Sequence, residues 1–453
     1  MNESQSPASP SRGRHILAAV LADHGMLLVL GLLCVFFSVV TLDEQMPVGA
    51  EAARQLAESL PKSAAEGKRL LLVTGRGSDE DAFAASLVEQ AEAAGWSVAA
   101  VSQGGPREAR MALEAAAEPP ETVAVIACSA SAGAWGVFDD LGGRLPAFAE
   151  TTILRPQPSR WPNFLKATNL LNVANQIAVI AIVAIGMTLV ILTGGIDLSV
   201  GSLIALSSVA GAVVIRDACG GQAAGTAGML AGGAAGLLVC GIAGLLSGGV
   251  VTLFGIPPFI ATLGMMLVAS GSAYILAEGQ SINQVPDAFV WLGRGADLAG
   301  LPNAVVLMLV LYATAHIVMS RTTFGRYVYA VGGNAEAARL SGVPVQRVVL
   351  AVYVICGLLA GLGGIVMASQ LKSGAPTYGQ MYELYVIAAV VVGGTSLSGG
   401  EGRVLGTLVG ALIIAVIQNG INLSGVESYT QKVVLGLVIL AAVLLDRLRS
   451  RRG

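Results

Sequence analysis

The sequence has little charge, few aromatic residues and few of the side chains that hold metals or perform catalysis. Only 12% of its 453 residues are charged and 5% are aromatic, with three histidines and five cysteines. Average soluble proteins carry about 25% charged residues, which argues against a soluble globular chain. The cysteines lie far apart, without metal-ligand spacing. The net charge of -3 comes with no basic patch, so we expect no nucleic-acid partner. The scattered histidines and cysteines lead us to expect neither a metal site nor a catalytic site.

Long apolar runs dominate what the sequence does contain. Hydrophobic residues make up 54% of the chain, and its 58 glycines allow membrane helices to approach one another closely. A membrane helix needs about 20 apolar residues, so we expect an α-helical polytopic membrane protein of roughly ten spans. The first run, within 16–42, is interpreted as a retained anchor. The ten expected spans are 17–42, 170–192, 198–215, 225–250, 258–277, 302–320, 347–370, 383–396, 404–423 and 431–446.

Basic residues in short loops predict the orientation in the membrane, because such residues are retained on the cytoplasmic side. If the first span starts inside, both the N-terminus, 1–15, and the basic tail, 447–453, are cytoplasmic. The cytoplasmic side then has eleven basic residues and the opposite short loops have five. The eleven are Arg12, Arg14, Arg321, Arg326, Arg339, Arg347, Arg403, Arg447, Arg449, Arg451 and Arg452, and the five are Lys166, Arg216, Arg294, Lys372 and Lys432.

Residues 43–160 interrupt the membrane pattern and indicate an inserted soluble α/β domain with its core at about 66–156. Strands alternating with helices favour a parallel sheet of βαβ units, and the prolines from Pro146 to Pro162 predict an extended return to the membrane. The pattern resembles one lobe of the periplasmic sugar-binding proteins. Following one span, the insert is expected outside the cytoplasm; whether it binds solute, contacts a binding protein or is only structural stays open. The expected strands are 68–74, 96–101 and 123–128, with helices at 79–94 and 106–117.

A carboxylate, Asp197, stands in a glycine-rich break between the second and third apolar runs. Charge at membrane depth is costly unless it meets protein, water or a helix end. We therefore predict that Asp197 caps a helix beginning at Leu198, with direct solute contact as the alternative. The segment 393–400 repeats the frame of 194–201, which suggests related elements in two halves. The helix-break residues are Gly194, Gly195, Asp197, Ser199, Gly201, Gly393, Gly394, Ser396 and Ser398.

Several separated motifs together carry a family resemblance. In chain order they are Ile185-Gly186-Met187-Thr188-Leu189-Val190-Ile191-Leu192, the break at 194–202, Phe324-Gly325-Arg326-Tyr327, Gly332-Gly333-Asn334, the run 337–343, and Gly393-Gly394-Thr395-Ser396-Leu397. Residues 161–446 resemble the permease subunit of ribose-type sugar ABC importers. The resemblance implies a permease of the bacterial inner membrane, surrounded by lipid, for a monosaccharide or related small polyol. It also implies three partners: an ATPase subunit, a periplasmic sugar-binding protein, and a second copy or homologous permease.

The longest basic loop, 321–347, contains a short helix-forming run that Asn334 caps and that Gly342 and Pro344 end. The resemblance implies that this helix docks on the ATPase; a loop that only orients its neighbours by charge is the alternative. The run 397–401 is similar to an ABC ATPase signature, but the chain has no Gly-x-x-x-x-Gly-Lys-Ser/Thr phosphate loop, so ATP and Mg are expected on the partner. The coupling residues are Gly332, Gly333, Asn334, Glu336, Ala337, Ala338, Arg339, Leu340, Ser341 and Gly342.

Polar side chains on otherwise apolar spans are candidates for the solute path. Amides donate and accept hydrogen bonds with sugar hydroxyls without a charge penalty, whereas the alternative role is hydrogen bonding between helices. Glu383 has a further alternative, which is to stabilise a helix N-terminus. The candidates are Asn172, Asn175, Gln176, Thr188, Glu383, Gln418, Asn419 and Asn422.

Three functions of different classes are compatible with these motifs. The first is an ABC permease, the second an ion-driven secondary transporter with Asp197 at its ion site, and the third a sugar-sensing membrane receptor. The coupling loop favours the first over the second, and the glycine-rich bundle argues against the third. Three departures from the family pattern stand out: the insert, Tyr385 in place of a common acidic residue, and Glu401 in place of a basic one. Neither the solute nor the choice between homodimer and heterodimer follows from the sequence.

Overall fold

The computed structural model describes residues 12–61, 69–117 and 123–450. Contacts divide the chain into two compact units. The helical unit consists of residues up to Thr41 and from Asn163 onward, and the second unit is Leu42–Pro162.

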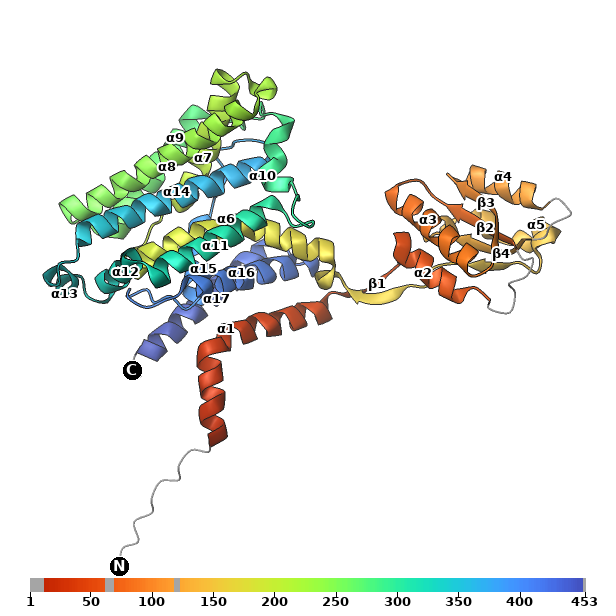
Figure 1. The fold of residues 1–453 in the computed structure, drawn as a ribbon, viewed down its shortest axis with the longest axis horizontal. Coiled ribbons are helices and arrows are strands. Elements are labelled where there is room, and N and C mark those ends of the chain that lie inside the picture. Colours follow the sequence, from red (N-terminus) through yellow and green to blue (C-terminus); the bar gives the residue numbers. More distant parts are fainter. Residues whose placement is uncertain (1–11, 62–68, 118–122, 451–453) are drawn as a thin grey trace, which may run out of the picture. The chain divides into compact units, whose positions relative to one another are not determined.

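The helical unit is a bundle whose longest members lie side by side (Figure 1). A five-residue π-helical turn, Val214–Ala218, follows directly on α7 (Val200–Val213). The α-helices are α1 (Arg12–Val40), α6 (Ala167–Leu192), α7 (Val200–Val213), α8 (Thr226–Phe254), α9 (Pro258–Leu276), α10 (Trp291–Arg294), α11 (Asn303–Arg321), α12 (Thr323–Gly333), α13 (Ala335–Leu340), α14 (Val345–Leu371), α15 (Tyr382–Val392), α16 (Val404–Leu423) and α17 (Ser428–Ser450).

Seven helices in the described part of the chain are long and apolar enough to cross a membrane, where the sequence predicts about ten. A membrane-spanning helix needs about 20 residues, and two of the expected spans are shorter apolar helices, Gly25–Val40 and Tyr382–Val392. The helix α17 is not among the seven. The seven are α6, α7 with its π-turn, α8, α9, α11, α14 and α16.

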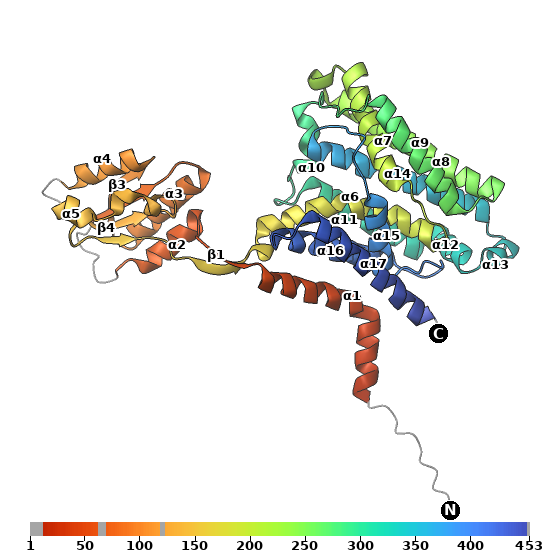
Figure 2. The ribbon, with the colours of Figure 1, turned by 180° about the vertical axis from the view of Figure 1, so that it is seen from behind.

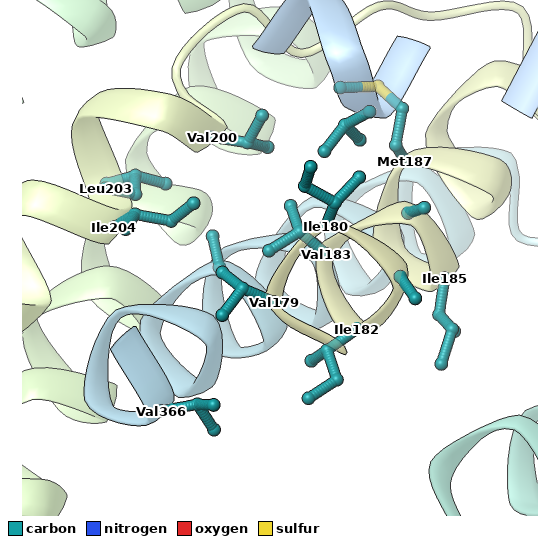
Figure 3. Close-up of a cluster of buried hydrophobic side chains, with 14 of the residues drawn as sticks. Val179, Ile180, Ile182, Val183, Ile185, Met187, Val200, Leu203, Ile204 and Val366 are labelled. Carbon is teal, nitrogen blue, oxygen red and sulfur yellow. The ribbon is translucent and has the colours of Figure 1, made fainter. Parts of the chain in front are cut away.

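The helix α6 is the most enclosed of the seven. Every residue from Ile177 to Leu192 is buried. Figure 3 shows side chains of α6 together with Leu203 and Ile204 of α7 and Val366 of α14. Thr188, the polar side chain within this buried stretch, therefore faces protein.

Glycines bring α8 and α14 into backbone contact. A Cβ atom added at Gly244 would lie 2.4 Å from the carbonyl oxygen of Tyr353, and one added at Gly357 would lie 2.3 Å from that of Cys240. Larger residues would separate these helices, which small residues bring together where lipid supplies no hydrophobic driving force. The helix α14 also packs against α6 and α7 (Figures 1 and 2).

The second unit contains a four-stranded parallel sheet in the order β3-β2-β4-β5. Apolar side chains from α2 and α3 pack on one face, and those from α4 and the segment 132–148 pack on the other. Parallel strands covered on both faces are apolar throughout, as Leu70, Leu71, Leu72 and Val73 are. The elements are β1 (Leu42–Gln45), α2 (Gly49–Ser59), β2 (Arg69–Thr74), α3 (Ser78–Ala93), β3 (Ser97–Gln103), α4 (Pro106–Ala116), β4 (Val123–Cys128), α5 (Leu141–Arg144), β5 (Thr152–Leu154) and β6 (Ser159–Pro162).

The proline-rich end of this unit is not the simple extended return that the sequence predicts. Pro146 begins a 3₁₀ turn, and Thr152–Leu154 adds the fourth strand of the sheet. Pro162 ends β6, which pairs antiparallel with β1. Proline is tolerated at such positions because it begins a turn or ends a strand without losing a central ladder hydrogen bond.

The two crossings of the chain into and out of the helical unit lie side by side. The backbone N–H of Asn163 donates to the carbonyl of Thr41 at 2.9 Å, and that of Phe164 donates to the Thr41 hydroxyl at 3.1 Å. Phe164 is buried against Phe37 of α1 and Ile417 of α16. These bonds fix the end of α1 beside the start of α6.

Candidate functional site

The two glycine-rich breaks have the same backbone geometry. After α6, the N–H of Gly194 donates to Ile191 and that of Gly195 to Val190, at 2.9 and 3.0 Å. After α15, Gly394 and Thr395 repeat these bonds to Val391 and Val390, at 2.9 and 3.2 Å. Gly194 and Gly394 have φ of +80° and +81°, the left-handed conformation that glycine adopts when it ends a helix in this motif. The repeated sequence frame therefore forms a repeated helix ending.

Asp197 is fully buried between α6 and α7. Its Oδ1 atom accepts hydrogen bonds from the backbone N–H and the hydroxyl of Ser199, at 2.9 and 2.6 Å. The helix begins at Val200 with Ser199 at the N-cap position, not at Leu198 as the sequence predicts. Asp197, two residues before the N-cap, thus holds the turn that leads into the helix, because it accepts hydrogen bonds from two donors of Ser199.

The short helix α13 forms where the basic loop predicts it. The Asn334 side chain caps it by accepting from the N–H of Ala337 at 2.9 Å, and Gly342 follows its end with φ of +86°. Arg339 donates to Glu336 one turn earlier, and this hydrogen bond lowers the pKa of the Glu336 carboxyl. Figures 1 and 2 show α13 at the end of the helical unit opposite α10.

Three candidate solute-path residues line one cavity. Gln176 of α6 and Gln418 and Asn422 of α16 meet residues of α15 and α17 around a space of about 290 Å³. Small-molecule sites occupy roughly 300–1,000 Å³ and combine apolar walls with a few polar groups, as here. The lining residues are Val173, Gln176, Ile177, Ile180, Gln380, Tyr382, Tyr385, Ala415, Gln418, Asn422 and Gln431.

Three other candidates hold helices together. Thr188 is buried and shares a 2.8 Å hydrogen bond with Thr407 of α16. Asn175 donates to the carbonyl of Gly293 at 3.0 Å, and Asn419 exchanges amide hydrogen bonds with Asn169. These contacts are the interhelical alternative weighed for each residue. Asn172 is exposed and outside the cavity.

Glu383 lies half-buried in the first turn of α15, against the first turn of α7. A Cβ atom added at Gly201 would lie 2.2 Å from its Oε2 atom. Negative charge near helix N-termini is favourable, and this carboxylate lies at two of them. Glu383 also lines a second cavity of about 330 Å³. Gln380 lines both cavities, so the segment before α15 separates them.

Residues 169–443 match a protein-family model described as "Branched-chain amino acid transport system / permease component". The chain belongs to this permease family. The match covers more than half of the chain, including both breaks, α13 and the cavity-lining helices.

Curated relatives of the permease are named as sugar import or transport permeases. It is 45% identical over 257 residues to "Ribose import permease protein RbsC" of Escherichia coli (strain K12), which is 56% of this chain and 77% of that protein. The same protein of Bacillus subtilis (strain 168) is 45% identical over 293 residues, 64% and 88% of the two chains. "L-arabinose transport system permease protein AraH" of Escherichia coli (strain K12) is 38% identical over 253 residues, 56% and 74%. No solved structure gives a significant match.

Four residues around the permease's first cavity escaped the sequence analysis as candidates for solute contact: Gln380, Tyr382, Tyr385 and Gln431. The rings of Tyr382 and Tyr385 pack edge to face, with their centroids 6.0 Å apart. Gln380 lies in the irregular segment 372–381, whose sequence has no helical periodicity to indicate that it lines a cavity. Gln431, on α17, donates to Asn422 at 2.5 Å. The feature of the sequence that could have identified Gln431 as a candidate is its amide side chain on a weakly apolar helix.

No group of three histidine, cysteine or acidic residues capable of holding a metal occurs within the described ranges. The five cysteines are free thiols, and Cys128, Cys240 and Cys356 are buried.

Proposed function

We propose that this permease is the membrane subunit of an ATP-driven ABC importer for a monosaccharide or related small polyol. The observation that carries the proposal is the family match over both breaks and α13, and the similarity to permeases named for ribose import and L-arabinose transport supports it. A cavity with four glutamines, one asparagine and two tyrosines offers donors and acceptors to hydroxyls without a fixed charge. The choice of solute within this class depends on which of its hydroxyls form hydrogen bonds with the polar side chains of the cavity.

The helix α13 has the surface of a docking element for a separate ATPase. Leu340 is 78% exposed on it, although α13 is not a membrane-spanning helix. Glu336 and Arg339 are both 66% exposed beside it. An exposed ion pair contributes only about 0–1 kcal/mol to folding stability. We therefore infer that Glu336 and Arg339 act by contacting the ATPase. An apolar anchor with charges at its rim is the common composition of a protein interface.

The test is uptake and ATP hydrolysis in membrane vesicles that contain the permease, the ATPase and the loaded binding protein. Replacing Glu336 and Arg339 together by alanine is expected to uncouple hydrolysis from uptake while the permease stays in the membrane. Removal of the exposed pair Arg110–Glu114 on α4 is the matched control, since it deletes equivalent charges elsewhere. Unchanged uptake in the α13 variant contradicts the docking role. Uptake that follows an ion gradient and ignores ATP would favour the secondary transporter.

We also infer the orientation. Both termini and α13 are cytoplasmic, and the basic residues counted on each side support this arrangement. The second unit, as an inserted α/β domain after the first span, is then extracytoplasmic. The parallel order of its sheet supports the resemblance to one lobe of a sugar-binding protein.

We infer that the second unit is an accessory to solute delivery that contacts the binding protein. A single lobe lacks the cleft in which two lobes enclose a sugar. Joining Thr41 directly to Asn163 should raise the concentration of loaded binding protein that gives half-maximal uptake. A variant with lower expression and unchanged half-saturation would assign the unit a structural role, and micromolar sugar binding by residues 42–162 would overturn the accessory role.

A further inference from the structure

Three segments far apart in the sequence meet at the end of α6. The backbone N–H of Gly400, in the second break, donates a 2.9 Å hydrogen bond to the carbonyl of Leu192, the last residue of α6. A Cβ atom added at Gly332, near the end of α12, would lie 1.7 Å from the same carbonyl oxygen and 2.5 Å from the nitrogen of Gly400. The contact is therefore backbone against backbone, with no side chain between.

Further contacts extend this meeting point to the first break. A Cβ atom at Gly399 would lie 3.1 Å from the nitrogen of Gly194 and 3.1 Å from the carbonyl oxygen of Gly332. One at Gly400 would lie 2.9 Å from the Cα of Gly333. We call Leu192, Gly332, Gly333, Gly399 and Gly400 the glycine junction.

We propose that the glycine junction transmits movement of α13 to both helix breaks, and that Gly332 and Gly400 are positioning residues for transport. This proposal rests on the proposed function, in which α13 meets the ATPase. The sequence places the junction next to α13: α12 ends at Gly333 and Asn334 caps α13 without any linker. The hydroxyl of Tyr329 on α12 also donates to the carbonyl of Gly402 at 2.9 Å, which ties α12 to the second break at another point.

Both helices that end at these breaks carry cavity-lining residues. The helix α6 contributes Gln176, Ile177 and Ile180 and ends at Leu192, and α15 contributes Tyr382 and Tyr385 and ends at Val392. Closely packed backbones transmit displacement because they do not compress. A shift of α12 and α13 therefore moves the ends of two walls of the cavity, which is the contiguous path that coupling between distant sites requires.

The first test is Gly332→Ala in the assembled permease, ATPase and binding protein. A methyl group there displaces backbone from backbone, so we expect solute moved per ATP hydrolysed to fall at least ten-fold, while ATP hydrolysis without binding protein stays within two-fold of the unmodified complex. Gly249→Ala is the control, because a Cβ at this helical glycine of α8 meets no atom within 4 Å. Gly333→Ala also enters open space and should lower the ratio far less than Gly332→Ala.

The second test approaches the junction from the other side and applies if Gly332→Ala does not assemble. Gly400→Ala combines a φ of +77° with the contact to Gly333, whereas Gly425→Ala has a φ of +69° and no neighbour within 4 Å. Both variants place alanine in a left-handed backbone conformation, so comparing them separates the effect of the contact from the effect of backbone strain. We expect the ratio of solute to ATP to fall in the first and to stay unchanged in the second.

Amide hydrogen exchange gives a readout that does not depend on transport. Gly332→Ala should speed exchange at Gly400, because its methyl group displaces the Leu192 carbonyl that accepts this N–H. Faster exchange with an unchanged ratio of solute to ATP overturns the transmission, and so does a loss of uptake and hydrolysis in equal proportion. If unmodified complexes show no ATP-driven uptake, the proposed function fails, independently of the exchange result.

Discussion

Asn169 and Asn419 exchange two amide hydrogen bonds, each 2.9 Å long, and so join the start of α6 to the end of α16. The adjacent residue, Gln418, lines the cavity instead. Two amides that are neighbours in the sequence thus have different roles, which substitution can separate.

Gln418→Ala is expected to lower maximal uptake about ten-fold, which corresponds to about 1.4 kcal/mol, because the solute loses a hydrogen-bonding partner. Its melting temperature in detergent should stay near that of the unmodified permease. Asn419→Ala should do the reverse and lower the melting temperature, since it removes both hydrogen bonds that join Asn169 to α16. Uptake rates at saturating loaded binding protein and thermal unfolding curves make the comparison. Equal behaviour of the two variants would contradict the assignment.

Asp197→Asn is expected to be tolerated, whereas Asp197→Leu should destabilise the fold by about 1–3 kcal/mol, because the buried Ser199 N–H and hydroxyl then lose their acceptor. Ser199→Ala, which removes only the hydroxyl bond, should have an intermediate effect. Thermal unfolding in detergent measures all three. A leucine variant with unchanged unfolding and uptake rules out the turn-holding role.

The stability of the second unit is expected to fall above about pH 9. Burial raises the pKa of the Cys128 thiol from 9.0 to about 12. Between these values the folded state keeps a proton that the unfolded chain releases, so the free energy of unfolding decreases as pH rises, by up to about 4 kcal/mol. Below pH 9 this group has no effect. Denaturant unfolding followed through the buried Trp96, with the other tryptophans replaced, should show a shallower decline in Cys128→Ala.

Orientation is testable with an impermeant maleimide in a variant whose five native cysteines are replaced. Cys128 itself is a poor reporter because its thiol is buried. Ala85→Cys, on the exposed face of α3, should react in intact spheroplasts, and Ser341→Cys, beside α13, only after the membrane is opened. Labelling of both positions from the same side contradicts the proposed orientation.

The sequence predicted local features well where one segment contains the whole signal. The long apolar run ending at Leu192 identified α6, and Asn334 with Gly342 identified α13 and its ends. Paired glycines located both breaks, because a left-handed helix ending favours a residue without a Cβ. By contrast, the apolar run from 383 to 396 predicted a span, but α15 has only 11 residues.

Contacts between distant segments could not be predicted from the chain alone. The junction of Leu192, Gly332 and Gly400 depends on backbone atoms, which every residue has, and nothing in the sequence pairs them. The cavity wall at Gln380 and Tyr382 depends on how an aperiodic segment folds back. Choosing between Gln418 and Asn419 required knowing that Asn169 faces only one of them.

The hydrogen bonds between Thr41 and Asn163 give the chain a natural splice point. The helical unit is left and re-entered at adjacent residues, and β1 and β6 leave that point as a paired ribbon. A domain whose own termini lie close together suits exchange at this point, because the hydrogen bonds between Thr41 and residues 163–164 lie within the helical unit. The position therefore offers a site for reporters or binding modules in engineered permeases.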